Sequence, residues 1–389
     1  MNILHVNHLL DPVRGGGTAE RAFQLSKELA QKGHQCTLLT MDIGETHSRA
    51  AGVAGLHVIA LPCLNFRFFV PRVSRKRIDA IVSGVDVVQI FGNWTILNLL
   101  VWLACKRLGK PLVFCPAGAL PAFGRSQFLK SLYTRYVSRG ILRDAMRCVC
   151  ITDDERKQFL SLGAASSKLV TIPNGIDPAQ YRLPDMVEKT EQFRTISGGA
   201  PILFYLGRLN PIKGPDLLLE AFIASASRWP DHHLVYGGPD GGMLAALKER
   251  AASCGLNERV HFIGFVDIAT KAVALHAAQL LIIPSRSEAM SIVVLEAGAC
   301  GCPALFTDTC GLEDFQRQDA GVMVSADPRS IAAALDELLG DPIRLREMGH
   351  RLKELVMTDF LWQRQASKHG AMYADVVAGS TLMTVAARA

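Results

Sequence analysis

Two glutamates, Glu288 and Glu296, lie eight positions apart in the stretch "PSRSEAMSIVVLEAGACGCPAL", around an apolar run. In an α-helix, eight residues advance about 12 Å and turn through about 800°, so both side chains could lie on one broad face. The paired carboxylates of a glycoside hydrolase work at roughly 5 to 9.5 Å. A hydrolytic pair therefore fits poorly unless Glu288 lies in a loop that folds back, and another role has to be considered.

The elements around these glutamates suggest that role. "LLIIPS" reads as a strand, "RSEAM" as the loop at its end and "SIVVLEAGACG" as a helix with Ser291 at its N-cap. A carboxylate at such a place accepts hydrogen bonds from hydroxyls, as acidic residues do for ribose in dinucleotide sites. The backbone amides of Met290, Ser291 and Ile292 could hold a phosphate. For Glu296 the alternative is a buried ion pair, for instance with a nearby arginine.

Two further clusters follow expected strands. In "FYLGRLNPIKG", Arg208 and Lys213 stand just after the strand, where two cations could neutralise a diphosphate. In "DPVRGGGTAER", three glycines separate the first strand from the first helix, where bare backbone can approach a phosphate or a sugar. The glycines do not spell GxGxxG, which disfavours a dehydrogenase. A pair of surface cations and a structural turn remain the simpler alternatives.

Composition bounds the class of protein. The 389 residues exceed the usual size of one hydrophobic core, and the 49% hydrophobic and 20% charged content is typical of a globular chain. The longest apolar run, "ILNLLVWLAC", falls short of the roughly 18 residues of a membrane span, and the amino terminus does not resemble a signal peptide. We therefore expect a cytoplasmic protein. Its ten cysteines are expected to be buried thiols and not disulfides or a zinc site.

Charge is concentrated in the first half of the chain. Residues 1–182 hold 23 Lys and Arg against 12 Asp and Glu, whereas the remainder holds 19 against 24. In the segment 123–143, five cations spaced four or five apart alternate with aromatic and aliphatic residues. This pattern predicts a basic amphipathic helix whose Lys130, Arg135 and Arg139 could meet an anionic membrane surface. The alternative, a solvated face of an ordinary packed helix, stays open.

Strand-like apolar runs alternate with helix-like ones along the whole chain, which predicts an α/β protein with doubly wound parallel sheets. The segment 172–201 interrupts the alternation because it is rich in proline, glycine and polar residues. We therefore expect two such domains facing a cleft, with ligands beyond the carboxyl ends of the strands.

Several motifs, in the right order, resemble a known family. "GGGTAERAFQLSKELAQKGHQCTLLT", "IPNGID", "GRLNPIKGPDLLLEAF" and "SEAMSIVVLEAGACGCPALFTDTCGL" are similar to the retaining glycosyltransferases of family 4, the group 1 transferases of the GT-B fold. The last motif matches the E-x7-E signature of that family. The resemblance implies two Rossmann-like domains and a returning helix, in this order: an acceptor-side domain at 1–180, a linker at 181–200, a nucleotide-sugar donor domain at 201–355, and a C-terminal helix at 356–389 that packs on the first domain.

The resemblance also implies roles for individual residues. Arg208 and Lys213 match the cations that bind the donor diphosphate without a metal, and with Glu288 they form the implied catalytic set. Glu288 would contact the hydroxyls of the donor sugar and Glu296 the ribose. The remaining implied donor-binding residues are Gly16 and Gly17, which match a loop that closes over the donor, and Met290, Ser291 and Ile292.

The sequence departs from the family pattern on the acceptor side. Many relatives have histidines where this chain has Gln89 and Phe91, and a histidine or arginine where it has Ala117. His8, after the first strand, is a candidate substitute, although a lone histidine is more often structural. Because the donor motifs are intact, we interpret the departures as divergence of the acceptor side. The candidate acceptor-side residues are His8, Asn93 and Gly118.

Three hypotheses remain for the function. The first is a retaining, metal-independent glycosyltransferase without a cofactor, which moves a sugar from a UDP- or GDP-sugar to a glycan or lipid-linked acceptor in surface polysaccharide assembly. The second is a nucleotide-sugar epimerase, and the third is a non-catalytic nucleotide-sugar-binding scaffold. The expected partners are these substrates and an anionic membrane surface on the inner face of the plasma membrane, with no nucleic acid.

Overall fold

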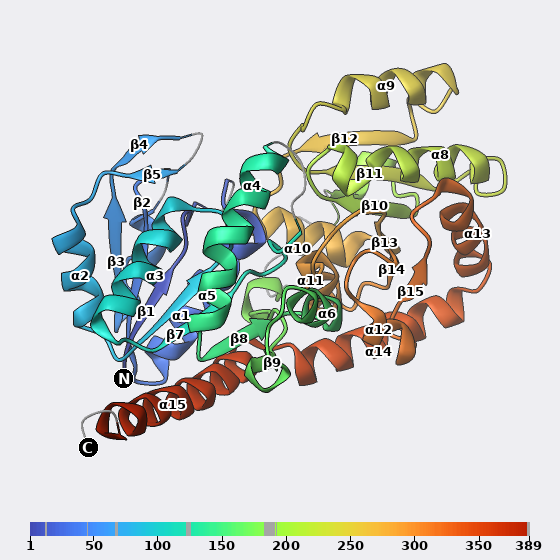
Figure 1. Cartoon of the computed structure of the whole chain (residues 1–389). Helices are drawn as coiled ribbons and strands as arrows, with labels where there is room; N and C mark the ends of the chain where they lie inside the picture. The colour runs from blue at the N-terminus through green and yellow to red at the C-terminus, as the bar shows by residue number, and fades with distance from the viewer. Residues whose placement is uncertain are drawn as a thin grey trace. The chain divides into compact units, whose positions relative to one another are not determined.

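In the computed structural model the chain divides into two compact units (Figure 1). The first comprises residues 1–174 and 362–389, and the second comprises residues 175–361. The described residues are 1–11, 14–44, 46–66, 69–121, 126–182, 191 and 193–386. Parts of the glycine-rich loop, of the basic segment 123–143 and of the expected linker 181–200 lie outside them.

The first unit is built on a sheet of seven parallel strands in the order β3-β2-β1-β6-β7-β8-β9. Most of these strands are apolar throughout because both faces of the sheet are covered. The order reverses between β1 and β6, which pair in parallel with Ile3 opposite Val87. The strands are β1 (Asn2–Val6), β2 (Gln35–Met41), β3 (Leu56–Leu61), β6 (Val87–Phe91), β7 (Leu112–Cys115), β8 (Arg147–Cys150) and β9 (Leu169–Thr171), with a separate antiparallel hairpin of β4 (Cys63–Asn65) and β5 (Val70–Pro71).

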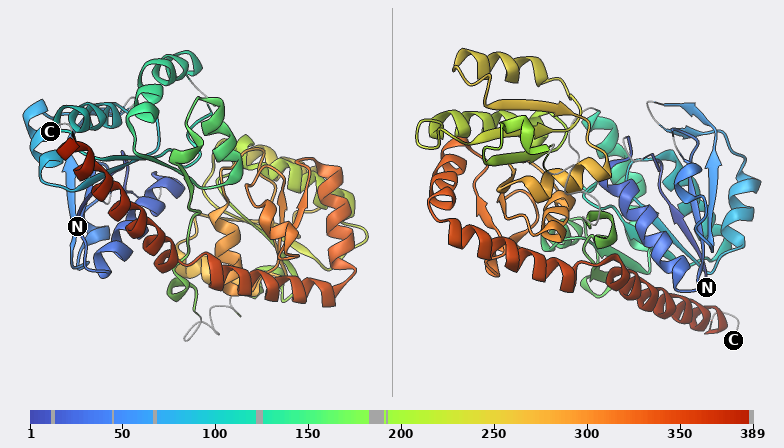
Figure 2. Two further views of the ribbon diagram at one scale, coloured as in Figure 1. Left: turned by 60° about the horizontal axis from the view of Figure 1, so that its bottom comes forward. Right: turned by 180° about the vertical axis from the view of Figure 1, so that it is seen from behind.

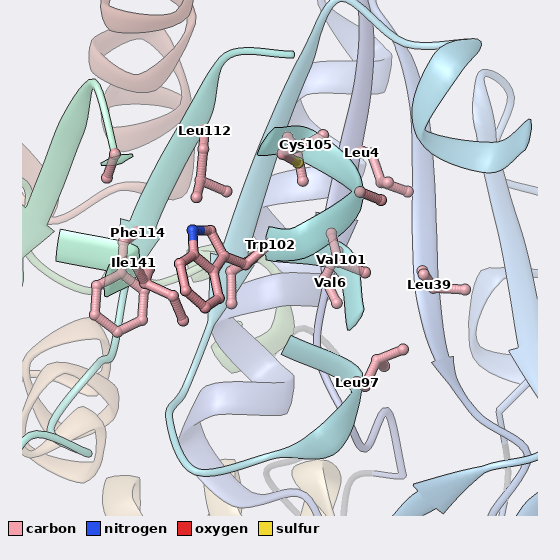
Figure 3. Close-up of a cluster of buried hydrophobic side chains, with 14 of the residues drawn as sticks. Leu4, Val6, Leu39, Leu97, Val101, Trp102, Cys105, Leu112, Phe114 and Ile141 are labelled. Carbon is pink, nitrogen blue, oxygen red and sulfur yellow. The ribbon is translucent and has the colours of Figure 1, made fainter. Parts of the chain in front are cut away.

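Alternate side chains of β1 enter the two layers that cover this sheet, as expected for a strand. Leu4 and Val6 pack in a core with Trp102, Phe114 and Ile141 (Figure 3). His5 points into the other layer, where it meets α1 and α15. The helices of this unit are α1 (Gly16–Gln31), α2 (Arg75–Ser83), α3 (Ile96–Leu108), α4 (Gln127–Tyr133), the π-helical turn η2 (Thr134–Ser138), α5 (Arg139–Asp144), α6 (Asp153–Ser161) and α15 (Trp362–Ala386), with short 3-10 turns η1 (Ser48–Ala50) and η3 (Ser166–Lys168). Among the described residues, no helix is both long and apolar enough to span a membrane.

The last helix, α15, packs against α1 and β6 (Figure 2). A buried polar chain connects these elements: the Tyr373 hydroxyl donates to Gln89 Oε1 at 2.6 Å and lies 3.0 Å from His5 Nε2, while His5 Nδ1 lies 2.6 Å from Ser26 Oγ. Burial lowers the pKa of His5 to about 3, so its imidazole is neutral at physiological pH. The C-terminal helix is therefore fixed to the first unit by hydrogen bonds as well as by apolar contact.

A second buried contact lies where the chain leaves the first unit. The Arg21 side chain of α1 is fully buried, and its guanidinium donates to the side-chain oxygen of Asn174 and to the carbonyl of Ile172, each at 2.9 Å. It also lies 6.0 Å from the ring centre of Trp362, where the chain returns. Arg21 therefore contacts the residues that come directly before and directly after the second unit in the chain.

Replacement of Arg21 by methionine should lower the free energy of unfolding by about 3 kcal/mol, because two hydrogen bonds from a charged donor are lost and their buried acceptors stay unsatisfied. Urea unfolding followed by circular dichroism measures this loss. Arg77→Met, at an exposed position of α2, is the matched control and should change stability by no more than about 0.5 kcal/mol. Equal stability of the two variants would contradict the assigned role of Arg21.

The second unit has a sheet of six parallel strands in the order β12-β11-β10-β13-β14-β15, which reverses between β10 and β13. One face packs on α8, α9 and α13, and α11 lies against α10 and α14. The strands are β10 (Ile202–Leu206), β11 (His233–Gly237), β12 (Val260–Gly264), β13 (Leu280–Ile283), β14 (Ala304–Thr307) and β15 (Val322–Val324). The helices are α8 (Pro215–Ser225), α9 (Leu244–Ser253), α10 (Ile268–Ala277), α11 (Ile292–Cys300), α12 (Glu313–Arg317), α13 (Pro328–Leu339) and α14 (Pro342–Asp359), with 3-10 turns η4 (Pro178–Tyr181), η5 (Thr195–Ser197) and η6 (Pro211–Lys213).

The division between the units differs by a few residues from the sequence expectation of a first domain ending at 180 and a C-terminal helix from 356. The turn η4 packs on α10 and α11, and Tyr181 donates a hydrogen bond to Glu296, so this segment belongs to the second unit. At the other end, α14 continues to Asp359 within the second unit, and α15 begins at Trp362.

Candidate functional site

The candidate donor residues lie at the reversal point of the second sheet. Arg208 and Lys213 follow β10, and the segment 284–291 follows its neighbour β13. In open α/β sheets, ligands bind outside the carboxyl ends of the strands at the point where the strand order reverses. The structure therefore brings together the cluster of Arg208 and Lys213 and the loop that carries Glu288, which are separated by about seventy residues of chain.

Backbone contacts hold the two loops against one another. Gly214 adopts φ +64°, and a Cβ there would lie 2.0 Å from the carbonyl oxygen of Pro284, so this close approach requires glycine. The backbone N–H of Arg286 donates to the carbonyl of Ile212 at 2.8 Å. The turn that carries Lys213 and the loop that carries Glu288 are thus one structural unit.

An ion pair reinforces this contact. The Arg286 guanidinium donates to both carboxylate oxygens of Asp216, at 2.8 and 2.6 Å, and to the carbonyl of Pro211 at 2.7 Å. Partial burial alone would raise the pKa of Asp216, but the hydrogen bonds and charge of Arg286 more than offset this and hold it below its ordinary value. Sequence analysis did not single out either residue, because seventy positions separate them.

Asp216→Asn keeps the size of this side chain but removes its charge, so it should loosen the turn that carries Lys213. We expect binding of the nucleoside diphosphate that the sequence predicts to weaken about tenfold, because small misplacement of a binding group is costly. Calorimetric titration with UDP and with GDP measures it. Glu220→Gln is the matched control, since Glu220 lies on the same helix and forms a similarly exposed bidentate pair with Arg250. If Asp216→Asn bound UDP and GDP with unchanged affinity, Asp216 would have no role in positioning the turn that carries Lys213.

Lys213 and Glu288 form an ion pair at the end of the strands. Lys213 Nζ donates to Glu288 Oε1 at 2.6 Å, and Ser285 Oγ donates to Glu288 Oε2 at 3.1 Å. The Lys213 side chain is about one third exposed and that of Glu288 less so. An ammonium has three N–H donors and each carboxylate oxygen has two lone pairs, so both groups can bind a ligand while they bind each other.

The Arg208 side chain is exposed, and its guanidinium makes no hydrogen bond or ion pair with the described residues. A glycine-rich loop after β11 packs beside it: a Cβ on Gly238 would lie 2.0 Å from the carbonyl oxygen of Gly207, and one on Gly241 would lie 3.0 Å from Arg208 Cγ. Sequence analysis missed this loop, although its "GGPDGG" run is a visible signal. Small residues here leave the guanidinium accessible for an anion.

Helix α11 begins beside the same loop. Ser291 occupies the N-cap position, as the sequence predicts, but its side chain makes no capping hydrogen bond, and its buried Oγ has no partner among the described residues. Its backbone N–H donates to the carbonyl of Cys310 at 3.1 Å. The first-turn amides of α11, from Ile292 onward, are therefore not satisfied by this side chain, and they carry the positive end of the helix dipole.

Glu296 lies inside α11 and is almost fully buried. Its Oε1 accepts hydrogen bonds from Lys271 Nζ at 2.6 Å and from the Tyr181 hydroxyl at 2.8 Å, whereas its Oε2 is buried without a partner in the described part of the chain. The buried ion pair considered for Glu296 is present, with a lysine in place of an arginine. Glu288 and Glu296 bind different lysines, and Oε2 remains able to accept from a ligand hydroxyl.

The other candidate residues lie in the first unit. Gly16 and Gly17 are exposed in the first turn of α1, and Gly16 has φ +59°. His8 and Asn93 line a cavity at the carboxyl ends of β1 and β6. Asn93 is also used structurally, since its Nδ2 donates to the carbonyl of Ala119 at 3.2 Å and its Oδ1 accepts from Ser138 Oγ at 2.9 Å. The backbone N–H of Gly118 donates to a buried carboxylate, Glu155 Oε1, at 2.6 Å.

The structure shows the surroundings of Gln89, Phe91 and Ala117, where the sequence departs from the pattern that the resemblance implies. Gln89 is fully buried and accepts the hydrogen bond from Tyr373 of α15, and Phe91 is buried with its ring edge-on to His5 at 5.3 Å. Ala117 adopts φ +49°, an uncommon conformation for a residue other than glycine. Gln89 therefore belongs to the packing of the C-terminal helix in this chain, and Phe91 packs on His5, which is itself bonded to that helix.

Comparisons with known proteins agree with these observations. Residues 15–180 match the model described as Glycosyltransferase Family 4, and residues 186–355 match Glycosyl transferases group 1. The D-inositol 3-phosphate glycosyltransferase of Nocardia farcinica is 30% identical over 90% of this chain and 83% of its own. That of Mycobacterium marinum is 34% identical over 86% of this chain and 76% of its own.

Solved structures share the fold at lower identity. HepE from Anabaena, in complex with UDP and glucose, matches with a TM-score of 0.80 and 16% identity over 96% of this chain and all of that chain. WaaG, a glycosyltransferase involved in lipopolysaccharide biosynthesis, matches with a TM-score of 0.69 and 18% identity over 95% of this chain and 99% of its own. The two parallel-sheet units, the motifs and these matches establish that the chain belongs to glycosyltransferase family 4, the group 1 glycosyl transferases, with the GT-B fold.

Proposed function

We propose that this glycosyltransferase moves a sugar from a UDP- or GDP-sugar to a hydroxyl of a glycan or lipid-linked acceptor, with retention of configuration and without a metal or a cofactor. One observation carries the proposal: Arg208, the Lys213–Glu288 pair and the start of α11 meet at the reversal point of the second sheet. An accessible guanidinium, an ammonium and helix amides together suit a diphosphate.

The charges fit the chemistry of transfer. The bond between the anomeric carbon and the terminal phosphate oxygen breaks, a bond to the acceptor hydroxyl oxygen forms on the same face, and the hydroxyl proton passes to the departing phosphate. Negative charge grows on the nucleoside diphosphate as the bond breaks. Arg208 and Lys213, with the amides at the start of α11, would stabilise that charge more strongly in the transition state than in the bound donor.

The two glutamates would orient the donor. Glu288 keeps lone pairs free while it holds Lys213, so it can accept from sugar hydroxyls next to the diphosphate. Glu296 would accept from the ribose through Oε2, while Lys271 and Tyr181 fix Oε1. Gly16 and Gly17 remain candidates for a loop that closes on the donor.

The relatives support part of this assignment. The solved HepE structures contain UDP with glucose, or UDP-glucose, which favours UDP as the donor nucleotide. The curated relatives act on D-inositol 3-phosphate by name, so a sugar phosphate is the main competitor of a glycan or lipid-linked acceptor. A role in surface polysaccharide assembly is part of the proposal, and WaaG offers a parallel in lipopolysaccharide biosynthesis.

The decisive assay measures nucleotide release from UDP- and GDP-sugars with and without a membrane extract as the acceptor source. Acceptor-dependent release, with a product whose anomeric configuration by NMR matches the donor, supports the proposal. Interconversion of nucleotide-sugars without release would favour an epimerase. Tight binding without turnover would favour a scaffold. Loss of all activity on addition of EDTA would overturn metal independence.

The proposal also places the protein at the cytoplasmic face of the plasma membrane, on an anionic surface. The segment predicted to be a basic amphipathic helix is helical from Gln127 to Asp144, through α4, η2 and α5. Arg135 and Arg139 are exposed along it, and Phe128 and Tyr136 are 76% and 65% exposed. Cations interleaved with exposed aromatic rings are typical of a helix that lies on a lipid headgroup layer.

Charge reversal at Arg135 and Arg139 should strongly reduce co-sedimentation with vesicles that contain phosphatidylserine, because each cation near such a surface contributes about 1 kcal/mol to binding. Reversal of Arg344 and Arg346 of α14, of which Arg346 is exposed and Arg344 is partly exposed, is the control and should have little effect. If the charge reversal at Arg135 and Arg139 left vesicle binding at the wild-type level, this helix would have an ordinary solvated face and no membrane role.

A further inference from the structure

A cavity of about 870 Å³ lies within the first unit. Its lining comes from the segments that follow β1, β6 and β7, from α1 and α4, and from Phe69, just before β5. It therefore lies at the reversal point of the first sheet, between β1 and β6, as the donor candidates do in the second sheet. The volume is within the range of roughly 300–1,000 Å³ that is usual for small-molecule sites.

The lining is mainly apolar and aromatic. Phe69, Trp94, Ile96, Leu129 and Tyr133 contribute to it. The Tyr133 hydroxyl is already used, since it donates to the carbonyl of Thr95 at 2.8 Å. Such a lining gains free energy by removing a hydrocarbon from water, and it offers little to a ligand that carries hydroxyls all around.

The residues that line the cavity with polar side chains are His8, Thr18, Asn93, Thr95, Ser126 and Lys130. The side chains of Asn93 and Thr95 are already hydrogen-bonded within the protein. Lys130 lines the cavity with Nζ 4.6 Å from the centre of the Trp94 ring, and none of the described lining residues is acidic. His8 Nδ1 is buried and has no partner among the described residues, while its ring packs edge-on to Phe69 at 4.8 Å. Burial lowers the pKa of His8 to about 4, so its imidazole is neutral at physiological pH. Depending on the tautomer, Nδ1 can donate a hydrogen bond to a ligand phosphate or accept one from a ligand hydroxyl.

Helix α4, which forms one wall of the cavity, also carries exposed apolar side chains that do not line it. Leu129, Lys130 and Tyr133 line the cavity, whereas Phe128, Leu132 and Tyr136 of the same helical segment do not line it and are 76%, 45% and 65% exposed. The segment contains the π-helical turn η2, a feature frequent at functional sites. An apolar wall that continues into an exposed apolar and basic face suits a ligand that comes from a membrane.

We propose that this cavity binds the hydrocarbon chain and phosphate of a lipid phosphate, so that the acceptor is lipid-linked and not a free sugar phosphate. Binding of a lipid phosphate in this cavity does not depend on the proposed function. Only its identification as the acceptor rests on the proposed function. Lys130 would pair with the phosphate, and the ring of Trp94 and the side chain of Leu129 would contact the chain.

The test uses farnesyl phosphate, below the concentration at which it forms micelles, in calorimetric titrations of the full chain. Farnesyl phosphate should bind at least about tenfold more tightly than D-inositol 3-phosphate, because only the first ligand buries a hydrocarbon chain. Farnesol should bind more weakly than farnesyl phosphate, and Lys130→Gln should remove that difference. Tighter binding of inositol phosphate would overturn the proposal.

A matched pair of variants separates the cavity from the outer face of the helix. Leu129→Asp places a charge in the cavity wall and should weaken farnesyl phosphate binding about tenfold or more, whereas Leu132→Asp should leave it within twofold. Both positions are about half exposed, so both variants should fold, and an unchanged melting temperature checks this. Equal effects of the two variants would overturn the assignment of the chain to this cavity.

Separate measurements distinguish failure of the inference from failure of the proposed function. UDP and GDP binding, which the second unit should provide, is titrated in the same preparations. Farnesyl phosphate binding without nucleotide binding would overturn the proposed function and leave the lipid site in place. Transfer to a water-soluble acceptor by a protein that does not bind farnesyl phosphate would overturn the lipid site and leave the transferase in place.

Discussion

Arg208→Ala and Lys213→Ala should each lower kcat of sugar transfer about 10²- to 10³-fold, with a smaller change in KM for the donor. Removal of one preorganised group that stabilises transition-state charge has a cost of this size in other enzymes. In the proposed mechanism both cations bind the diphosphate, where charge grows as the bond to the sugar breaks, so their loss should act mainly on kcat.

Steady-state rates of nucleotide release measure this effect. Arg228→Ala is the matched control because Arg228 is a cation of the same unit, paired with Asp336 at 2.6 Å, and follows α8 away from the carboxyl ends of the strands. This control should retain nearly full activity. A Lys213→Ala variant that raises KM and leaves kcat unchanged would mean that the lysine binds donor and transition state equally, and the catalytic role would be withdrawn.

Glu296→Gln should weaken nucleotide binding at least about tenfold, because the residue proposed to accept from the ribose hydroxyls loses its negative charge. Hydrogen bonds to charged groups contribute about 1.5–3 kcal/mol. Titration with UDP and GDP measures the dissociation constant directly. Because Lys271 would lose its ion-pair partner, some loss of fold stability is expected as well, and urea unfolding of the same sample quantifies it.

Tyr181→Phe separates the two effects. It removes a hydrogen bond to Glu296 Oε1 but keeps the carboxylate and its pair with Lys271. We expect nucleotide affinity within about threefold of the wild type, since the carboxylate that is proposed to contact the ribose is retained. Unchanged affinity in Glu296→Gln would remove the ribose assignment and leave the buried ion pair as the whole role of this residue.

The sequence was sufficient for the features that are local or periodic. Alternating apolar runs predicted two parallel sheets, and the positions just after β10 and β13 follow from where those runs end. The family motifs then predicted which side chains meet there. Ser291 was correctly placed at the start of α11, yet its missing capping bond could not be predicted, because the position of a residue in the sequence does not determine its side-chain rotamer.

Features that depend on distant pairs were not predictable from one sequence. The pairing of Arg286 with Asp216, and of Glu296 with Lys271, joins residues of separate elements whose spacing follows no local period. The same applies to Gln89, which looked like a departure at the acceptor side and is bonded to Tyr373 of the last helix. Its burial depends on how α15 packs, which no pattern near Gln89 reveals.

The central claim is that the second unit binds a nucleoside diphosphate-sugar through Arg208, Lys213 and Glu296. Calorimetric titration of the wild type and of an Arg208→Ala/Lys213→Ala double variant with UDP and with GDP, in buffer containing EDTA, tests it most directly. We predict saturable binding of one nucleotide by the wild type without added metal, and a loss of at least about a hundredfold in the double variant. Equal affinity in the two proteins, or no binding by the wild type, would contradict the account.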